Sequence, residues 1–248
     1  DPVSSAAASS QGFFKTQEND AACVPRDALP QAILDFADFI YKHTRIELIL
    51  GGSAATFLYL KKNNPRDYDF ILLNINKEDL LKLLAENGYK AQLVGSKVPI
   101  IKVKLETSAG TLSLDLSTEI IKSSEPLTKT MEGLLVNRDF KLSALYVVLQ
   151  HGAKQFEVKG FDRAIRSLNS KLISVVNHKH TLFIDGPICL FRLVKNSLQY
   201  PDFQLDDELQ GILGATDIKK CFVTYLQNPV FAIVNRGQIS TALEILFD

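Results

Sequence analysis

The segment Asp67–Asn74 begins with alternating acidic and aromatic side chains and continues as an apolar run, Asp-Tyr-Asp-Phe-Ile-Leu-Leu-Asn. This pattern favours a β-strand, in which successive side chains point to opposite faces. Asp67 and Asp69 therefore share one face of a predicted sheet, while Tyr68 and Phe70 share the other. Two carboxylates held so close together are costly unless a cation neutralises them. The alternative is that both are ordinary exposed groups at the start of a strand.

A predicted hairpin supplies a third carboxylate. Val98–Leu105 and Thr111–Leu116 favour two strands joined around Ser108-Ala109-Gly110. Asp115 then lies on the polar face of its strand, opposite the leucines on either side of it. We expect Asp67, Asp69 and Asp115 to act as metal ligands. Mg²⁺ is the expected cofactor, because it prefers hard oxygen ligands and fills its remaining positions with water and phosphate oxygens.

A glycine pair follows the first predicted strand of this region. Arg45–Leu50 reads as a short buried strand that leads into Gly51-Gly52-Ser53 and then a predicted helix, Ala54–Lys61. Without side chains, such a turn allows a phosphate to approach backbone N–H groups and the positive end of the helix. A tight strand-to-helix turn would favour glycine as well. Gly51, Gly52 and Ser53 are therefore candidate ligand-binding residues with a purely structural alternative.

The order of predicted elements indicates an α+β protein with a mixed sheet followed by helices. Helices are predicted for five segments: Pro30–His43, Lys77–Glu86, Asp139–Gln150, Asp162–Leu168 and Gly186–Gln199. We expect a flexible N-terminal arm over residues 1–27, a head over residues 28–135, and a helical neck and C-terminal region over residues 136–248.

The charge balance limits the partners of this chain. Lysine plus arginine equals aspartate plus glutamate, 28 against 28, so no net positive field attracts nucleic acid. A nucleic-acid contact would need a local patch, for which Lys102 and Lys104 on one predicted strand face are candidates. Whether that face adjoins the aspartates depends on strand register. The longest apolar runs are too short to cross a membrane, and three widely spaced cysteines favour the reducing cytoplasm over a disulfide framework.

Four segments match one family in order and spacing. They are Leu50-Gly51-Gly52-Ser53-Ala54, Arg66-Asp67-Tyr68-Asp69-Phe70, Gly95-Ser96-Lys97 with the strands up to Asp115, and Asn137-Arg138-Asp139-Phe140-Lys141-Leu142-Ser143-Ala144-Leu145. Through them the chain resembles the class II tRNA nucleotidyltransferases and bacterial poly(A) polymerases of the polymerase-beta-like nucleotidyltransferase superfamily. The resemblance implies a polymerase-beta-like head, a helical neck, Mg²⁺, and transfer of a nucleotide from a nucleoside triphosphate with loss of pyrophosphate. It also implies that Arg138 and Asp139 contact the sugar and triphosphate.

The chain departs from the family where the incoming base is selected. The family uses an aspartate and an arginine in the neck helix, whereas this chain has Asp185-Gly186-Pro187-Ile188-Cys189 followed by Arg192 and Lys195. A glycine and a cysteine cannot present the hydrogen bonds that select cytosine and then adenine, so ordered CCA addition is not expected. Arg192 and Lys195, one helical turn apart, are candidates for holding the triphosphate, with a solvated helix face as the alternative.

Three functions remain open at this point. The first is transfer of a nucleoside monophosphate, with ATP as the expected donor, to the 3′ hydroxyl of a small RNA or tRNA. The second keeps the chemistry but uses a hydroxyl of a protein or small molecule. The third is a catalytically silent module that binds a nucleotide or a partner.

Overall fold

The computed structural model describes residues 21–62, 65, 67–95, 99–121, 125–178, 182–185 and 188–226. Its centre is an eight-stranded sheet in the order β1-β8-β7-β2-β3-β6-β5-β4. The strands are β1 (Ala21–Pro25), β2 (Ile49–Gly51), β3 (Asp67–Leu73), β4 (Ala91–Val94), β5 (Ile100–Thr107), β6 (Gly110–Glu119), β7 (Leu145–Val148) and β8 (Gln155–Gly160). Only β3 and β6 pair in parallel within this sheet, whose other pairs are antiparallel. The predicted mixed α+β fold is confirmed.

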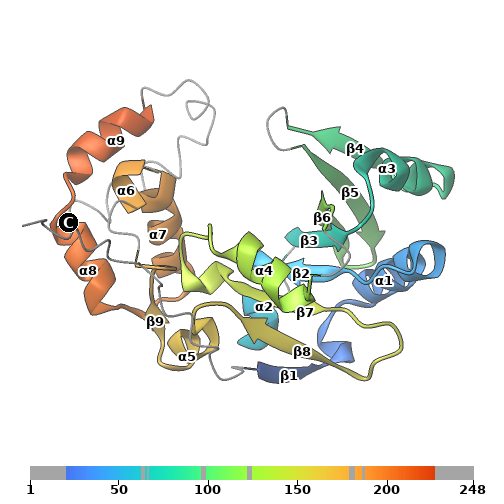
Figure 1. The fold of residues 1–248 in the computed structure, drawn as a ribbon, viewed down its shortest axis with the longest axis horizontal. Helices are drawn as coiled ribbons and strands as arrows, with labels where there is room; N and C mark the ends of the chain where they lie inside the picture. Colours follow the sequence, from blue (N-terminus) through green and yellow to red (C-terminus); the bar gives the residue numbers. More distant parts are fainter. Residues whose placement is uncertain are drawn as a thin grey trace, which may run out of the picture.

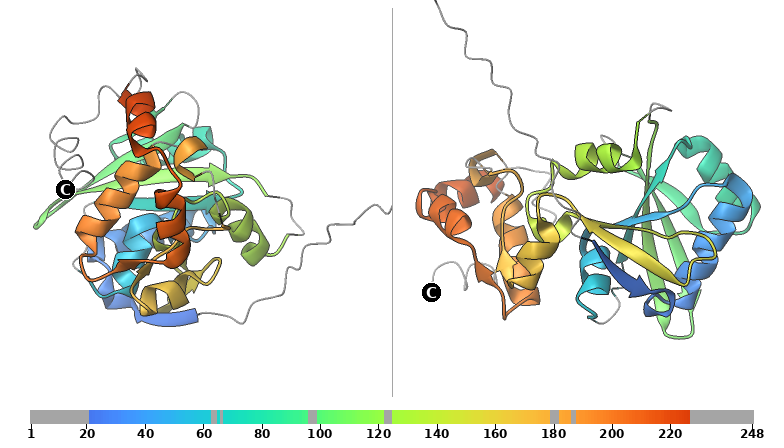
Figure 2. Two further views of the ribbon diagram at one scale, coloured as in Figure 1. Left: turned by 90° about the vertical axis from the view of Figure 1, so that its left-hand side faces the viewer. Right: turned by 60° about the horizontal axis from the view of Figure 1, so that its bottom comes forward.

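Helices pack on both faces of the sheet, and a further group of helices lies at one end of the molecule (Figures 1 and 2). They are α1 (Gln31–Thr44), α2 (Gly52–Tyr59), α3 (Lys77–Glu86), α4 (Leu127–Leu135), α5 (Ala164–Asn169), α6 (Leu182–Asp185), α7 (Ile188–Gln199), α8 (Asp207–Gly214) and α9 (Ile218–Leu226). Two short strands, β9 (Leu172–Ile173) and β10 (Gln204–Leu205), form a separate parallel pair. Figure 1 shows α6–α9 grouped at the end of the molecule opposite α1 and α3. None of the described helices combines the length and apolar character needed to cross a bilayer.

The two faces of the sheet differ in what covers them. Tyr68, Phe70 and Leu72 of β3 are buried in the main core, which also takes the apolar residues of α1. Those residues recur at three- and four-residue spacing, so they form one face of the helix. On the opposite face a smaller cluster, Ile49, Ile71, Met131, Leu135 and Tyr146, packs α4 against β2, β3 and β7. Beyond that cluster the same face carries polar side chains.

Several predicted elements are confirmed by the structure. Lys77–Glu86 forms α3 with the predicted bounds, and the hairpin around Ser108-Ala109-Gly110 joins β5 to β6. The helices predicted over Pro30–His43, Asp162–Leu168 and Gly186–Gln199 correspond to α1, α5 and α7. Residues 1–20, most of the predicted flexible arm, lie outside the described residues.

The helix predicted over Asp139–Gln150 is wrong. Lys141–Ser143 forms one turn of 3-10 helix and Leu145–Val148 forms β7, which lies between β2 and β8. Leu145, Tyr146 and Val147 are all buried, because a strand in the middle of a sheet covered on both faces needs apolar residues at successive positions. A short apolar run of this kind cannot be distinguished from a helical segment by periodicity alone.

The predicted boundaries do not coincide with the limits of the sheet. Strands β7 and β8 join the sheet from beyond residue 135, and β1 lies within the arm predicted for residues 1–27. β1 pairs with β8 along its whole length, so this part of the predicted arm is an edge strand. The division of the chain into domains stays a prediction.

Candidate active site

Strand register brings the three predicted carboxylates onto one face. Asp69 of β3 lies opposite Asp115 of the parallel neighbour β6, and Asp67 lies opposite Ser113 one step earlier. The intervening residues Tyr68 and Leu114 are buried on the other face. Because neighbouring strands are about 4.8 Å apart, Asp69 and Asp115 are adjacent. Had Asp115 faced the core, no shared acidic site could form.

The second glycine of the turn makes room for Asp69. Gly51 pairs with Asp69 across β2 and β3, and Gly52 follows as the first residue of α2. A Cβ atom on Gly52 would lie 2.6 Å from Oδ2 of Asp69, and the backbone of Gly52 has a φ of +62°. Both the left-handed backbone and the nearby carboxylate therefore require glycine here. The contact with Asp69 thus explains why position 52 is a glycine without any bound phosphate. The predicted ligand role of Gly51, Gly52 and Ser53 stays a prediction.

Asp69 is in an environment that opposes its negative charge. Burial of the carboxyl group and the neighbouring charge of Asp115 raise the pKa of Asp69, and Asp67 adds to this effect. Arg138 and Lys102 lower the pKa of Asp69, but the net shift is upward. Burial of the carboxyl group, together with the neighbouring carboxylates, therefore outweighs the two cations at Asp69.

Lys102 makes a direct bond within this cluster. It lies opposite Asp115 in the antiparallel pair of β5 and β6, and its Nζ donates to both carboxylate oxygens at 2.7 Å and 2.9 Å. Lys104 lies opposite Ser113 on the same face. The strand register therefore places Lys102 and Lys104 on the same face as the aspartates, a relation that the sequence alone left open.

The donor set fits a hard divalent cation in its chemistry. Three carboxylates on one face provide oxygen ligands of the kind that Mg²⁺ prefers. As the side chains stand, no three His, Cys, Asp or Glu groups among the described residues are arranged to hold a metal ion. Asp115, whose two oxygens accept from Lys102, would have to exchange that ammonium group for a metal. The predicted ligands are therefore neighbours in the sheet without forming a preassembled metal centre.

The candidate residues Asp139 and Arg192 lie where helix α7 meets the segment that leads into β7. Asp139 accepts a hydrogen bond from Arg192 of α7, in an ion pair that joins the two parts. Lys195 is exposed one turn further along α7, and Cys189 of the same helix is buried in the main core. Arg138 acts on Asp69 through its charge. Of the predicted triphosphate contacts, Arg138 is thus near enough for its charge to lower the pKa of Asp69, and Arg192 forms an ion pair with Asp139.

Sequence reasoning missed a buried contact that holds the turn in place. Thr56 of α2 is fully buried, and its hydroxyl donates to the carbonyl oxygen of Leu142. This bond ties the helix after the glycine turn to the segment that carries Arg138 and Asp139. A polar residue among Ala54, Ala55 and Leu58 was the available signal, but its partner lies 86 residues away in sequence.

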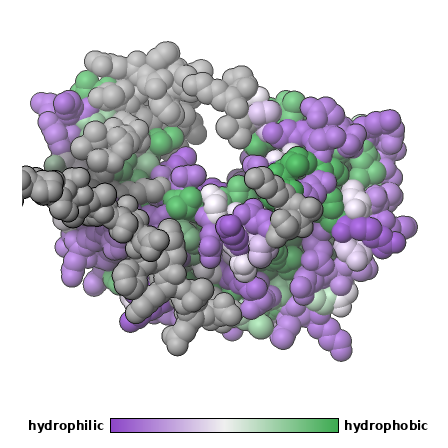
Figure 3. Space-filling view, viewed as in Figure 1, coloured by the Kyte–Doolittle hydropathy of each residue, from purple (hydrophilic) through white to green (hydrophobic). Residues whose placement is uncertain are grey.

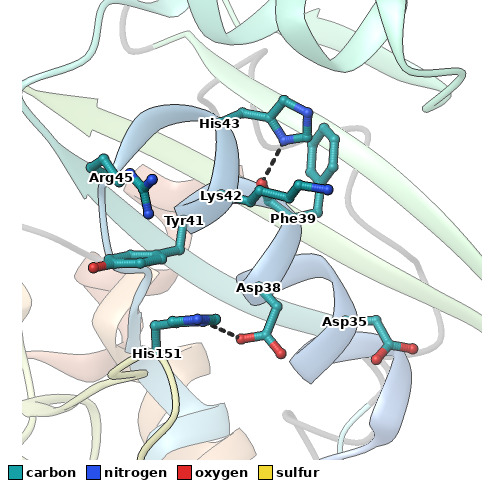
Figure 4. A pocket seen from close by; sticks show the side chains of 8 residues that line it. All are labelled: Asp35, Asp38, Phe39, Tyr41, Lys42, His43, Arg45 and His151. Carbon is teal, nitrogen blue, oxygen red and sulfur yellow. Dashed lines mark hydrogen bonds and ion pairs between the residues drawn. The ribbon is translucent and has the colours of Figure 1, made fainter.

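A separate hollow of about 410 Å³ lies beside α1 (Figure 4). Among its lining residues, Asp38 contacts Nδ1 of His151 at 2.9 Å, and Asp38 also accepts at 2.8 Å from Arg26, which lies outside the lining. Tyr41 stacks on the ring of His151 with 4.5 Å between centroids, and Arg45 lies over the Tyr41 ring. Its lining includes none of the predicted site residues. This hollow is therefore not part of the acidic site.

The space-filling view shows a deep notch between the helical part and the sheet (Figure 3). In the same orientation, β3, β5 and β6 lie on one side of the notch, and α6 and α7 lie on the other (Figure 1). The strands that carry the carboxylates and lysines therefore belong to one of its walls.

Several solved structures share the fold of this chain. No protein-family model and no curated protein matches the sequence. Among solved structures, a CCA-adding enzyme in complex with CTP is similar at a TM-score of 0.65 and 19% identity, covering 88% of this chain and 49% of that one. A tRNA nucleotidyltransferase complexed with a primer tRNA and an incoming ATP analogue is similar at a TM-score of 0.56 and 19% identity, covering 84% and 55%. The Thermotoga maritima CCA-adding enzyme complexed with tRNA is similar at a TM-score of 0.54 and 19% identity, covering 84% and 50%.

This chain thus spans about half the length of the solved structures that it matches. At such identities the similarity establishes the architecture. The chain has the mixed α+β fold of the head domain of CCA-adding enzymes.

Proposed function

We propose that this chain is a metal-dependent nucleotidyltransferase that moves a nucleoside monophosphate from a nucleoside triphosphate, with ATP as the expected donor, to the 3′ hydroxyl of an RNA. One observation carries the proposal. Asp69 and Asp115 are direct neighbours on adjacent strands, and Asp67 shares their face beside the glycine turn. The fold of the head of CCA-adding enzymes supports the same chemistry.

Each group of site residues has its own role in the proposed reaction. Asp67, Asp69 and Asp115 would hold Mg²⁺, which when bound polarises the attacking hydroxyl and shields the charge of the leaving pyrophosphate. Arg138, whose charge already reaches Asp69, would contact the triphosphate close to the carboxylates. The remaining proposed nucleotide contacts are Gly51, Gly52 and Ser53 at the turn, and Asp139, Arg192 and Lys195 at the junction with α7.

An RNA acceptor is supported by the surface beside the carboxylates. Lys102 and Lys104 form a local strip of lysines on one face of β5 beside the acidic site, in which Lys102 is paired with Asp115 and Lys104 is exposed. Backbone phosphates of an RNA would be attracted to such a strip. Solved structures with this fold include complexes with CTP, ATP and tRNA.

We infer further that the nucleotide is added without CCA-type base choice. Cys189, which stands within the neck-helix pattern that reads the base in the family, is buried in the core. Its side chain therefore offers no hydrogen-bonding edge to an incoming base. Incorporation should follow the concentration of each triphosphate, with no switch from cytosine to adenine.

The test uses each of the four α-labelled triphosphates with Mg²⁺ and short RNAs that end in a 3′ hydroxyl or a 3′ deoxy group. We expect extension of the hydroxyl-ended RNA alone, and loss of extension in Asp67→Asn and Asp115→Asn. Asp207→Asn is the matched control, because Asp207 is an exposed aspartate in the first turn of α8, outside the carboxylate cluster. Absence of extension with every RNA would remove the proposed acceptor. Label on protein or on a small hydroxyl compound would instead identify the second acceptor class.

A catalytically silent nucleotide-binding module is a second candidate, and two contacts favour it. Lys102 bonds Asp115, and Arg192 bonds Asp139, so three of the proposed ligand-binding groups, Asp115, Asp139 and Arg192, are already neutralised within the chain. Such a module would bind a triphosphate with the same affinity in Mg²⁺ and in EDTA. Release of pyrophosphate that disappears in Asp115→Asn would exclude it.

A further inference from the structure

We propose that Lys102 is a tethered counter-ion of Asp115, which a divalent metal must displace before it can bind, and that the triphosphate assists this displacement. This inference rests on the proposed function, because it assumes that the three carboxylates hold a metal. A further consequence is that the metal and the triphosphate bind cooperatively.

The geometry shows why Lys102 and a metal compete. Nζ of Lys102 lies 2.7 Å from one oxygen of Asp115 and 2.9 Å from the other. A Mg²⁺ ion bonds a carboxylate oxygen at about 2.0–2.1 Å, which would leave the ion less than about 5 Å from the ammonium group. Two cations at this separation repel each other, so a metal at Asp115 favours departure of Lys102.

Lys102 is able to leave Asp115, and Asp69 has one carboxylate oxygen close to Gly52. The Lys102 side chain is 38% exposed on a flexible stem, so its ammonium group can turn into solvent. Asp69 lies against Gly52, where even a Cβ atom would come within 2.6 Å of its Oδ2. A metal that binds Asp115 therefore requires the bond between Lys102 and Asp115 to break.

The triphosphate offers the released ammonium group a new partner. A lysine displaced from Asp115 remains on β5 beside the site and carries a positive charge that phosphate oxygens attract. Without nucleotide, the metal must replace Lys102 with no compensating contact for the ammonium group. With nucleotide, that contact is available, so the affinity for metal should rise. By linkage, metal and nucleotide then strengthen each other's binding by the same factor.

The test measures Mn²⁺ binding by electron paramagnetic resonance on the full chain, with and without a non-hydrolysable ATP analogue. We expect Lys102→Met to bind Mn²⁺ without nucleotide about two- to tenfold more tightly than wild type, the range that follows from loss of a partly exposed ion pair and of cation repulsion. In the same variant the nucleotide should enhance Mn²⁺ binding less than in wild type, because phosphate oxygens still bind the metal and only the contact with Lys102 is lost. Its metal-free form should melt at a lower temperature, because Asp115 then faces Asp69 without a counter-ion.

Lys82→Met is the matched control, since Lys82 forms an exposed ion pair with Glu86 on α3, which packs against the main core on the face of the sheet away from the carboxylates. It should leave both Mn²⁺ affinity and the nucleotide effect at wild-type values. Lys102→Gln, which keeps a polar side chain of similar length, gives the same comparison if the methionine variant does not fold. Adding Asp67→Asn to Lys102→Met should abolish the tightened binding and so locate it at the carboxylates.

The outcomes separate this inference from the proposed function. Unchanged or weaker Mn²⁺ binding in Lys102→Met and Lys102→Gln, with clear binding in wild type, overturns the counter-ion role and leaves the metal site intact. No Mn²⁺ binding in any variant, with or without nucleotide, overturns the proposed metal site and the inference together. Tighter binding in Lys82→Met as well would show a general charge effect and would also overturn the specific role of Lys102.

Discussion

Replacing Gly52 with alanine is expected to destabilise the protein and to displace a proposed metal ligand. A φ of +62° at Gly52 would cost an alanine about 1–2 kcal/mol. The added Cβ atom would also lie 2.6 Å from Oδ2 of Asp69, which forces the carboxylate to turn. An off-rotamer side chain costs about 0.5–1.5 kcal/mol, and reduced freedom of the unfolded chain offsets about 0.4–1 kcal/mol.

The net loss from these contributions is about 2 kcal/mol, or about 4–8 °C in Tm for a chain of this size. Differential scanning calorimetry of the metal-free protein measures it. Gly51→Ala is the matched control, because Gly51 has a φ of −129° and a Cβ atom added there would meet no heavy atom within 4 Å. We expect that control to stay within about 1 kcal/mol of wild type. Equal melting temperatures for the two variants would refute the reasoning.

A double-mutant cycle separates the two causes of this loss. In an Asp69→Ala background the carboxylate is absent, so Gly52→Ala should retain only the backbone cost. The difference between the two backgrounds should be about 0.5–1.5 kcal/mol, the estimate for turning the carboxylate. A difference of zero would show that Asp69 is not in contact with position 52. Nucleotidyl transfer should fall in Gly52→Ala beyond what its lower stability explains.

Three other changes test the site and its surroundings. The pKa of Asp69 is raised in the folded protein, so the folded state loses stability as pH rises through that pKa. Metal-free Asp69→Asn should therefore melt above wild type at pH 7. The gain should fade below about pH 4 and vanish near about pH 2, where the carboxyl is protonated in both the folded and the unfolded state. The buried hydroxyl of Tyr68 has no hydrogen-bond partner among the described residues, so Tyr68→Phe should raise the free energy of unfolding in urea by about 1 kcal/mol, and a loss would indicate a partner. Arg192→Met should weaken triphosphate binding, measured by calorimetry, while the free energy of unfolding falls by no more than about 1 kcal/mol, since Arg192 is exposed. Lys195→Met on the same helix face should act in the same direction, and unchanged affinity in both would assign Arg192 to its ion pair with Asp139 alone.

Local sequence patterns predicted the elements that form the site. The alternation at Asp67–Phe70 predicted which side chains share a face, because side-chain direction in a strand depends only on position along it. The three- and four-residue spacing of apolar residues predicted α1 for the same kind of reason. β7 escaped prediction because its apolar residues are dictated by the layers above and below the sheet.

The sequence by itself determined that three aspartates lie on polar strand faces and that a glycine pair precedes a helix. Only the tertiary structure decided that Asp115 lies beside Asp69, that Lys102 bonds Asp115, and that Gly52 yields space to Asp69. Strand order and register are set by packing between segments far apart in the chain, and a shift of one residue would turn each of these side chains to the other face. Periodicity therefore defines the faces of each strand, and the assembled sheet determines which side chains meet.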